Sequence, residues 1–204
     1  MFMTELVVAG VLLSGFAFGK FLFNRFFRKS MQSKGVTYNL KGDVVSCLFC
    51  RIQKREEPGN IAYEDDKFVV FHTIAPASKI HFLVTPREHI RNLRSLQGEE
   101  GALVVEDLVR IGRIALGEHG DGALYCFHVP PFNSIDHLHL HAIAQPERMT
   151  FLGRGKYTIG TWYCHSAEQV IQRLRAEQTA CKNCGEKSCA CRQGKKRRVA
   201  PIIK

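Results

Sequence analysis

Hydrophobic and polar residues alternate most clearly in the segment DHLHLHAI, residues 136–143. His137, His139 and His141 take every second position, and apolar residues stand between them. In a β-strand, side chains at every second position point to the same face, whereas a helix would scatter them. The pattern therefore predicts a strand with one apolar face against a core and one face that carries three imidazoles.

The middle of the chain predicts further strands and two helices. Strand patterns with turn signals between them occupy IAYEDDKFVVFHTIAP, KIHFLVTPREHI and GALYCFHV. Apolar residues at helical spacing fill residues 97–118, which Gly117 and Gly120 end. Ser166 with Gln169 forms a capping box for a last helix, AEQVIQRLRAEQ. This order indicates an α+β domain with an antiparallel sheet.

The first 30 residues predict a membrane anchor. The stretch LVVAGVLLSGFAFGKFLF is mostly apolar and about as short as a spanning helix can be, since ~17–25 residues are usual. Glu5 precedes it, and Arg25, Arg28 and Lys29 follow. By the positive-inside rule we expect a single-pass membrane protein whose domain faces the cytosol, in the endoplasmic reticulum or the mitochondrial outer membrane. A transit peptide is the alternative.

The charge of the chain is concentrated at its two ends. The net charge is +10, and residues 1–35 and 179–204 hold the excess of lysine and arginine, so the middle is close to neutral. A basic groove for nucleic acid is therefore not supported. We predict a linker over 31–45, a domain over 46–178 and a Cys-rich basic tail over 179–204, either zinc-binding or simply solvated.

The cysteines and histidines carry the candidate chemistry. Eight cysteines with C-x-x-C and C-x-C spacings indicate metal or redox sites in a reducing compartment rather than a disulfide framework. Three adjacent imidazoles must be largely neutral, or hold an anion or a metal. On one strand they would span ~13 Å at ~3.3 Å per residue, too far to converge on one ion. A phosphate fits better, because an unprotonated ring nitrogen can attack phosphorus.

The segment HLHLHAI resembles the His-x-His-x-His-x-x signature of the histidine triad (HIT) superfamily. The resemblance runs from about Cys47 to Arg175 and includes CLFCRI, HFLVTPREHI and FHVPPFNSIDHLHLHAIA. It is closest to the Hint branch, and there to the third vertebrate-type member, which shares the F-H-x-P-P loop. It implies a HIT-type antiparallel sheet with one long helix and a C-terminal helix. It also implies a homodimer that hydrolyses nucleoside 5′-phosphoramidates and acyl-nucleotides through a nucleotidyl-histidine.

The resemblance implies a set of catalytic residues. His139 would be the nucleophile that takes the nucleotidyl group from the α-phosphate. His141 would hold the phosphate and help to protonate the leaving amine, with Ser134 beside it. His81, in KIHFLV, matches the histidine that orients the nucleophile. His137, the first histidine of the segment, completes the set.

The resemblance also implies a pocket for a purine nucleotide, with two departures from the family. Thr73 stands where the family usually has an aspartate that binds the ribose hydroxyls, so ribose binding is expected to be weaker or differently made. The Hint branch places an asparagine before the histidine segment, where Cys126 or His128 stands here. The expected pocket residues are Phe49, Ile52, Phe71, His72, Thr73, His128 and Asn133.

A zinc site is implied by likeness to the zinc-bearing members of the superfamily. Its ligands would be Cys47, Cys50, His89 of PREHI and His137. One C-x-x-C pair with two histidines suits a structural zinc ion. Two buried thiols without a metal are the alternative.

Two other functions compete with the phosphoramidase. One is a DNA-adenylate hydrolase resembling aprataxin, which also joins a histidine triad domain to a basic, Cys-containing C-terminal segment; the tail here lacks the paired histidines of that finger. The other is a nucleotide-binding adaptor with vestigial catalysis, which is suggested by Thr73 in place of the aspartate of the family.

Overall fold

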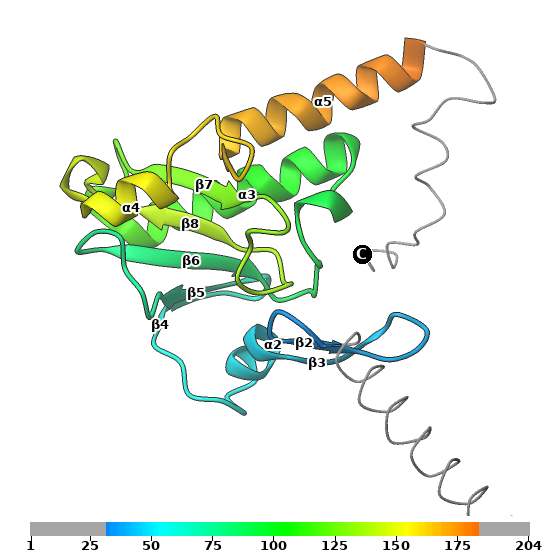
Figure 1. The fold of residues 1–204 in the computed structure, drawn as a ribbon, viewed down its shortest axis with the longest axis horizontal. Coiled ribbons are helices and arrows are strands. Elements are labelled where there is room, and N and C mark those ends of the chain that lie inside the picture. Colours follow the sequence, from blue (N-terminus) through cyan, green and yellow to red (C-terminus); the bar gives the residue numbers. More distant parts are fainter. Residues whose placement is uncertain (1–31, 184–204) are drawn as a thin grey trace, which may run out of the picture.

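A six-stranded sheet organises residues 32–183, which the computed structural model describes (Figure 1). Every pair of neighbouring strands is antiparallel. In order across the sheet, the strands are β4 (Ile61–Glu64), β5 (Phe68–His72), β6 (His81–Pro86), β8 (Leu140–Ile143), β7 (Leu124–His128) and β9 (Cys164–Ser166). The predicted α+β class with an antiparallel sheet is confirmed.

Two long helices pack over one face of this sheet, α3 (Gly98–Leu116) and α5 (Ala167–Asn183) (Figure 1). Helix α5 begins at the predicted capping box. The Ser166 backbone N–H donates to the Gln169 side chain (2.9 Å), and the Gln169 N–H donates to the Ser166 hydroxyl (3.2 Å). These reciprocal bonds satisfy donors that the first helical turn leaves free.

The strands divide their side chains between two layers, as their period of two requires. Val70, Phe82 and Leu140 join the core beneath α3. Phe71 and Leu83 face the other way and pack with residues of the short helix α2 (Leu48–Gln53). A second short helix, α4 (Phe151–Lys156), leads to a cluster at the β7–β9 side of that face. We call this second layer the site face.

The segment predicted as a linker, 31–45, differs in the structure. Its described residues supply β1 (Gln32–Ser33), β2 (Val36–Tyr38) and the start of β3 (Val44–Cys47), which form a three-stranded sheet. Lys34 donates to the Asn133 carbonyl (2.7 Å), and the Tyr38 hydroxyl donates to the Asp136 carboxylate (3.1 Å). These partners lie about a hundred positions away, so no local pattern could have indicated them.

The predicted localisation needs correction. Among residues 32–183, no helix combines the length and apolar character needed to cross a membrane. The longest of them, α3, carries acidic residues in its first turn and a basic residue in its last. Our prediction of a single-pass membrane protein is therefore wrong for the part of the chain that the structure describes. The anchor segment 1–30 and most of the tail (residues 184–204) lie outside the described residues.

Candidate active site

Four histidines from three strand segments gather on the site face. His81 begins β6, His128 ends β7, His141 lies in β8, and His139 lies just before that strand. All four are buried. Strand β8 starts only at residue 140, so the predicted strand is shorter than DHLHLHAI. The first histidine of the segment turns away to a cysteine pair instead of completing a row of three.

Three of these histidines form one chain of hydrogen bonds. The Ala77 backbone N–H donates to His81 Nδ1 (3.1 Å), and His81 Nε2 lies 3.0 Å from His141 Nδ1. His141 Nε2 then lies 3.1 Å from His128 Nδ1. His128 Nε2 lies 3.1 Å from the Lys156 carbonyl oxygen. The chain thus begins at a group that can only donate and ends at one that can only accept.

These two ends determine the tautomer of every ring between them. Because the Ala77 N–H donates to His81 Nδ1, the proton of His81 must be on Nε2, and His141 must accept it on Nδ1. By the same step His141 donates from Nε2 to His128, whose own Nε2–H meets the carbonyl. All three imidazoles are neutral, and an added proton would set two donors against each other at one link of the chain.

His139 stands outside this chain with one nitrogen free. Its Nδ1 lies 2.7 Å from the His137 carbonyl oxygen, which only accepts, so Nδ1 carries the proton. Its Nε2 therefore holds a lone pair, and this buried atom has no hydrogen-bond partner in the structure. A neutral ring fixed by its other nitrogen, with a bare lone pair, is the form in which histidine is nucleophilic.

Burial keeps the whole cluster uncharged. It lowers the pKa of His139 to about 4 and the pKa of His81 to about 3, and it lowers the pKa of His141 and of His128 as well. The positive charge of Lys156 acts in the same direction on His81. Desolvation penalises an imidazolium, so these rings are neutral at pH 7.

The lowered pKa of His81 makes the stability of the fold depend on pH. His81 titrates near 6.5 in the unfolded chain and near 3 in the fold, so the unfolded state binds more protons between those values. Its contribution is complete above pH ~6.5 and is lost as the pH falls toward 3. We expect the fall in melting temperature between pH 7 and pH 4.5 to be smaller in His81→Gln than in wild type. His165→Gln, on β9, should keep the wild-type dependence; equal dependences in all three proteins would contradict this account.

Tyr157 covers the histidine chain, and no pattern in the sequence indicated this position. Its ring is buried and lies 5.2 Å from the His81 ring and 5.0 Å from those of His128 and His141. It directly follows α4, in a stretch without a periodic pattern. The backbone groups of Ala77 and Lys156 were missed for the same reason, because a sequence does not show which main-chain atoms meet a side chain.

Three of the expected nucleotide-pocket residues lie together beside His139. The Phe49 ring is 5.4 Å from the Phe71 ring and 5.5 Å from the His139 ring, in edge contact with the latter. Ile52 packs into the same cluster, one turn along α2. An apolar wall thus stands next to the free imidazole nitrogen.

The remaining expected residues lie elsewhere. His72 packs edge-on against the Phe82 ring, on the α3 face of β5. The Asn133 amide donates within its own loop, and the Thr73 hydroxyl accepts from a backbone N–H in the next turn. Ser134 is exposed. His128 belongs to the histidine chain rather than to the apolar wall.

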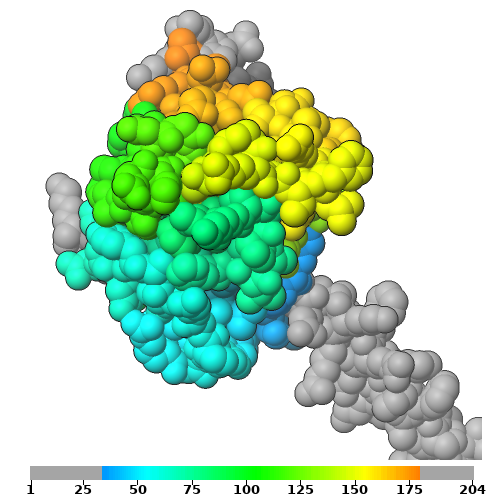
Figure 2. All heavy atoms as spheres, turned by 90° about the vertical axis from the view of Figure 1, so that its left-hand side faces the viewer, coloured from blue at the N-terminus to red at the C-terminus, as the bar shows by residue number. Residues whose placement is uncertain are grey.

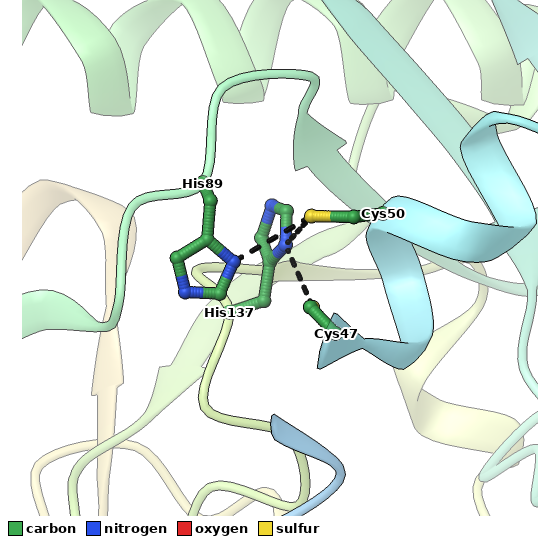
Figure 3. Close-up of side chains that lie close together, drawn as sticks. All are labelled: Cys47, Cys50, His89 and His137. Carbon is green, nitrogen blue, oxygen red and sulfur yellow. Dashed lines mark hydrogen bonds between the residues drawn. The ribbon is translucent and has the colours of Figure 1, made fainter. Parts of the chain in front are cut away.

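The four predicted metal ligands do meet (Figure 3). One ligand atom from each of Cys47, Cys50, His89 and His137 lies within 4.8 Å of the others. His137 Nδ1 is 3.4 Å from Cys47 Sγ and 3.5 Å from Cys50 Sγ, and His89 Nδ1 is 3.6 Å from Cys50 Sγ. Bonds of ~2.3 Å to sulfur and ~2.0 Å to nitrogen would separate tetrahedral ligands by about 3.6 Å.

The hydrogen bonds of this cluster also suit a metal ion. His137 Nε2 lies 3.0 Å from the Pro86 carbonyl, so it carries the proton and leaves the lone pair of Nδ1 directed at the thiols. A hydrogen bond with Cys50 lowers the pKa of Cys47, whereas the same bond and burial raise the pKa of Cys50, so one thiolate of the pair is favoured before a metal binds. The donor set therefore fits a tetrahedral ion that binds sulfur and nitrogen.

Comparison with known proteins adds an independent finding. A family model described as "Scavenger mRNA decapping enzyme C-term binding" matches residues 46–157. Adenosine 5′-monophosphoramidase HINT3 of Xenopus tropicalis is 33% identical over 137 residues, 65% of this chain and 89% of that protein. The bifunctional adenosine 5′-phosphosulfate phosphorylase/adenylylsulfatase HINT4 of Arabidopsis thaliana is 36% identical over 50% of this chain and 71% of that protein. A solved HIT family hydrolase from Clostridium thermocellum is 29% identical over 50% of this chain and 92% of its own, with a TM-score of 0.44.

Proposed function

The chain belongs to the histidine triad family, in its Hint branch, and on this premise we propose that it hydrolyses nucleoside 5′-phosphoramidates and acyl-nucleotides. The substrate class is a purine nucleotide whose α-phosphate carries an amine or an acyl group. The observation that carries the proposal is the state of His139, with a proton on Nδ1 and an unpartnered lone pair on Nε2 beside an apolar wall.

The first chemical step is displacement at phosphorus. His139 Nε2 attacks the α-phosphorus, a P–N bond to the imidazole forms, and the bond to the leaving group breaks. The ring becomes cationic in this step. Its Nδ1–H already donates to the His137 carbonyl at 2.7 Å, and that hydrogen bond strengthens as the charge develops.

We assign the proton exchange of the reaction to His141. In the free protein its Nε2–H is engaged by His128. A bound phosphoryl anion would raise the pKa of His141, so that the ring can carry the proton that the leaving amine takes, with loss of the hydrogen bond that His81 Nε2–H donates in the free protein. In the second step water attacks phosphorus, its proton returns to His141, and the bond to His139 breaks. The products are the nucleotide and the free amine or acid.

We assign the Cys₂His₂ cluster to structural zinc as part of this proposal. Cys47, Cys50, His89 and His137 would hold the ion, and all four of its ligands would come from the protein. Bound zinc would supply no catalytic chemistry here, but it would fix the His137 ring and, through it, the backbone carbonyl that holds His139.

Turnover by the full-length protein tests the proposal. Purified protein should convert adenosine 5′-monophosphoramidate to AMP and ammonia, measured by chromatography of the nucleotides. Adenylated nicked DNA assayed in parallel should keep its adenylate. The middle of the chain is close to neutral, and its sequence predicts no basic groove for the DNA backbone. Nucleotide binding without hydrolysis would instead support the adaptor, and release of AMP from DNA alone would support the aprataxin-like alternative.

His128 provides a test of the histidine chain. His128→Phe removes the acceptor of His141 Nε2–H, and we expect kcat to fall about tenfold, the value of one hydrogen bond of ~1.4 kcal/mol. His128→Asn offers a carboxamide oxygen as acceptor and should restore most of kcat. Steady-state kinetics of the three proteins measure this difference. A loss of kcat in His128→Asn, with kcat retained in His128→Phe, would show that ring packing, not the hydrogen bond, is what His128 contributes.

A further inference from the structure

A hollow opens beyond His128, away from the apolar wall at Phe49. Its volume is about 390 Å³, and its lining includes His128, Phe132, Lys156, Trp162 and Tyr163. Apart from His128, its lining shares no residue with the metal cluster or with the residues expected to hold the nucleotide. It shares His128 and Lys156 with the histidine chain, and His128 Nδ1 lies 3.1 Å from His141 Nε2.

Three aromatic rings form the wall of this hollow. The Phe132 ring lies 4.5 Å from the Trp162 ring and 6.0 Å from the Tyr163 ring, with Trp162 and Tyr163 5.8 Å apart. Trp162 is 71% exposed and Phe132 is 43% exposed. Large exposed aromatic surfaces gathered at a hollow mark a binding site more often than a packing solution.

Hydrogen bonds hold this aromatic wall in place. The Tyr163 hydroxyl donates to the Gly155 carbonyl at 2.6 Å, and the Val129 N–H donates to the Tyr163 carbonyl at 2.9 Å. The Phe132 N–H donates to the Val129 carbonyl at 2.8 Å, which ties the loop before the histidine segment to the same frame. A ligand that binds here would not have to order these segments first.

The order of the strands places the hollow relative to the nucleotide. On the site face, Phe71 of β5 marks the nucleoside side, His141 of β8 the phosphate, and His128 of β7 the edge of the hollow. Figure 2 shows the yellow segment with α4 and the cyan segment with α2 and β4 toward opposite ends of the view. A nucleotide laid across this face from Phe49 to His139 would direct its leaving group toward the hollow.

We propose that this hollow is a subsite for the leaving group of the substrate and takes an alkylamine or acid that carries a planar aromatic ring. The proposal rests on the proposed function and narrows it to nucleotide conjugates with aromatic leaving groups. Stacking on Trp162 and Phe132 supplies the affinity. Lys156 favours neutral or anionic groups, so an amine that becomes cationic after cleavage is repelled and released.

Trp162 is the only tryptophan of the chain, so its fluorescence reports directly on the hollow. Full-length His139→Ala protein is titrated with AMP conjugates of 4-nitrophenethylamine and of cyclohexylethylamine, and with AMP. The nitroaromatic conjugate should quench the fluorescence of Trp162, whereas the saturated conjugate and AMP should not. The free nitroaromatic amine is the control for light absorption.

Two results would overturn the proposal. Quenching by AMP would place the nucleoside in the hollow, and absence of quenching by every conjugate would show that the leaving group does not bind there.

Turnover gives a second, independent measurement. In Trp162→Ala, the ratio of kcat/KM for the aromatic conjugate to that for the saturated conjugate should fall about tenfold, in the range of one aromatic stacking contact. Phe151→Ala is the matched control, because this α4 ring is 90% exposed and does not line the hollow. An unchanged ratio in Trp162→Ala would overturn the proposal. Absence of turnover on every conjugate, with quenching intact, would instead reject the proposed function alone.

Discussion

His139→Ala should abolish phosphoramidase turnover, with a loss of kcat of about 10⁴-fold or more, as expected when a covalent nucleophile is removed. Nucleotide binding should stay within about tenfold of wild type, since one ring contact to the apolar wall is lost and the wall itself remains. The physical reason is that no other ring of the cluster has a free lone pair. His81, His128 and His141 each use both nitrogens in the hydrogen-bond chain.

The covalent intermediate gives the decisive measurement for this variant. Mass spectrometry of wild-type protein quenched during turnover should find a nucleotidyl group on the peptide that contains His139, and none in the variant. His119→Ala is the control, because His119 lies after α3 and outside the site. Melting temperatures of both variants separate loss of chemistry from loss of fold. Wild-type rates in His139→Ala would refute the nucleophile assignment.

The sequence predicted the site best where a pattern over neighbouring residues determines the local structure. Alternation in residues 136–143 placed His141 and the apolar Leu140 on opposite faces, and the structure agrees. The capping box at Ser166 and the helix over 97–118 follow from equally local signals. In each case the forces that determine the element act within a few positions of the chain.

What the sequence missed depends on contacts between distant segments. The hairpin at Lys34 is held by the loop at Asn133, and the cover over the histidines comes from Tyr157 after α4. The sequence assigned His128 to the nucleotide pocket but did not indicate its hydrogen bond to His141, because the two residues lie on different strands. Tautomers are also invisible in sequence, since backbone groups of residues 77, 137 and 156 determine them.

Cys50→Ser should lose one equivalent of zinc and with it both stability and catalytic rate. Elemental analysis of the full-length variant should show about one zinc less per chain than wild type, a difference that excludes any metal held by the tail. Cys164→Ser is the matched control, because that buried thiol packs near Tyr157 and away from the cluster. A chelator should lower the melting temperature of wild type and of the control but not that of Cys50→Ser.

The effect on rate follows from how the cluster connects to the nucleophile. The ion would fix the His137 ring, whose Nε2–H is held by Pro86, and the carbonyl of the same residue accepts Nδ1–H from His139. Without the ion this carbonyl is free to shift, and the lone pair on His139 Nε2 no longer points in one fixed direction. We expect kcat to fall about tenfold to a hundredfold, as for other groups that orient a functional residue from outside it. A variant that loses its metal yet keeps full kcat would show that the backbone holds His139 unaided. Equal zinc content in wild type and Cys50→Ser would show that the four ligands do not form the site.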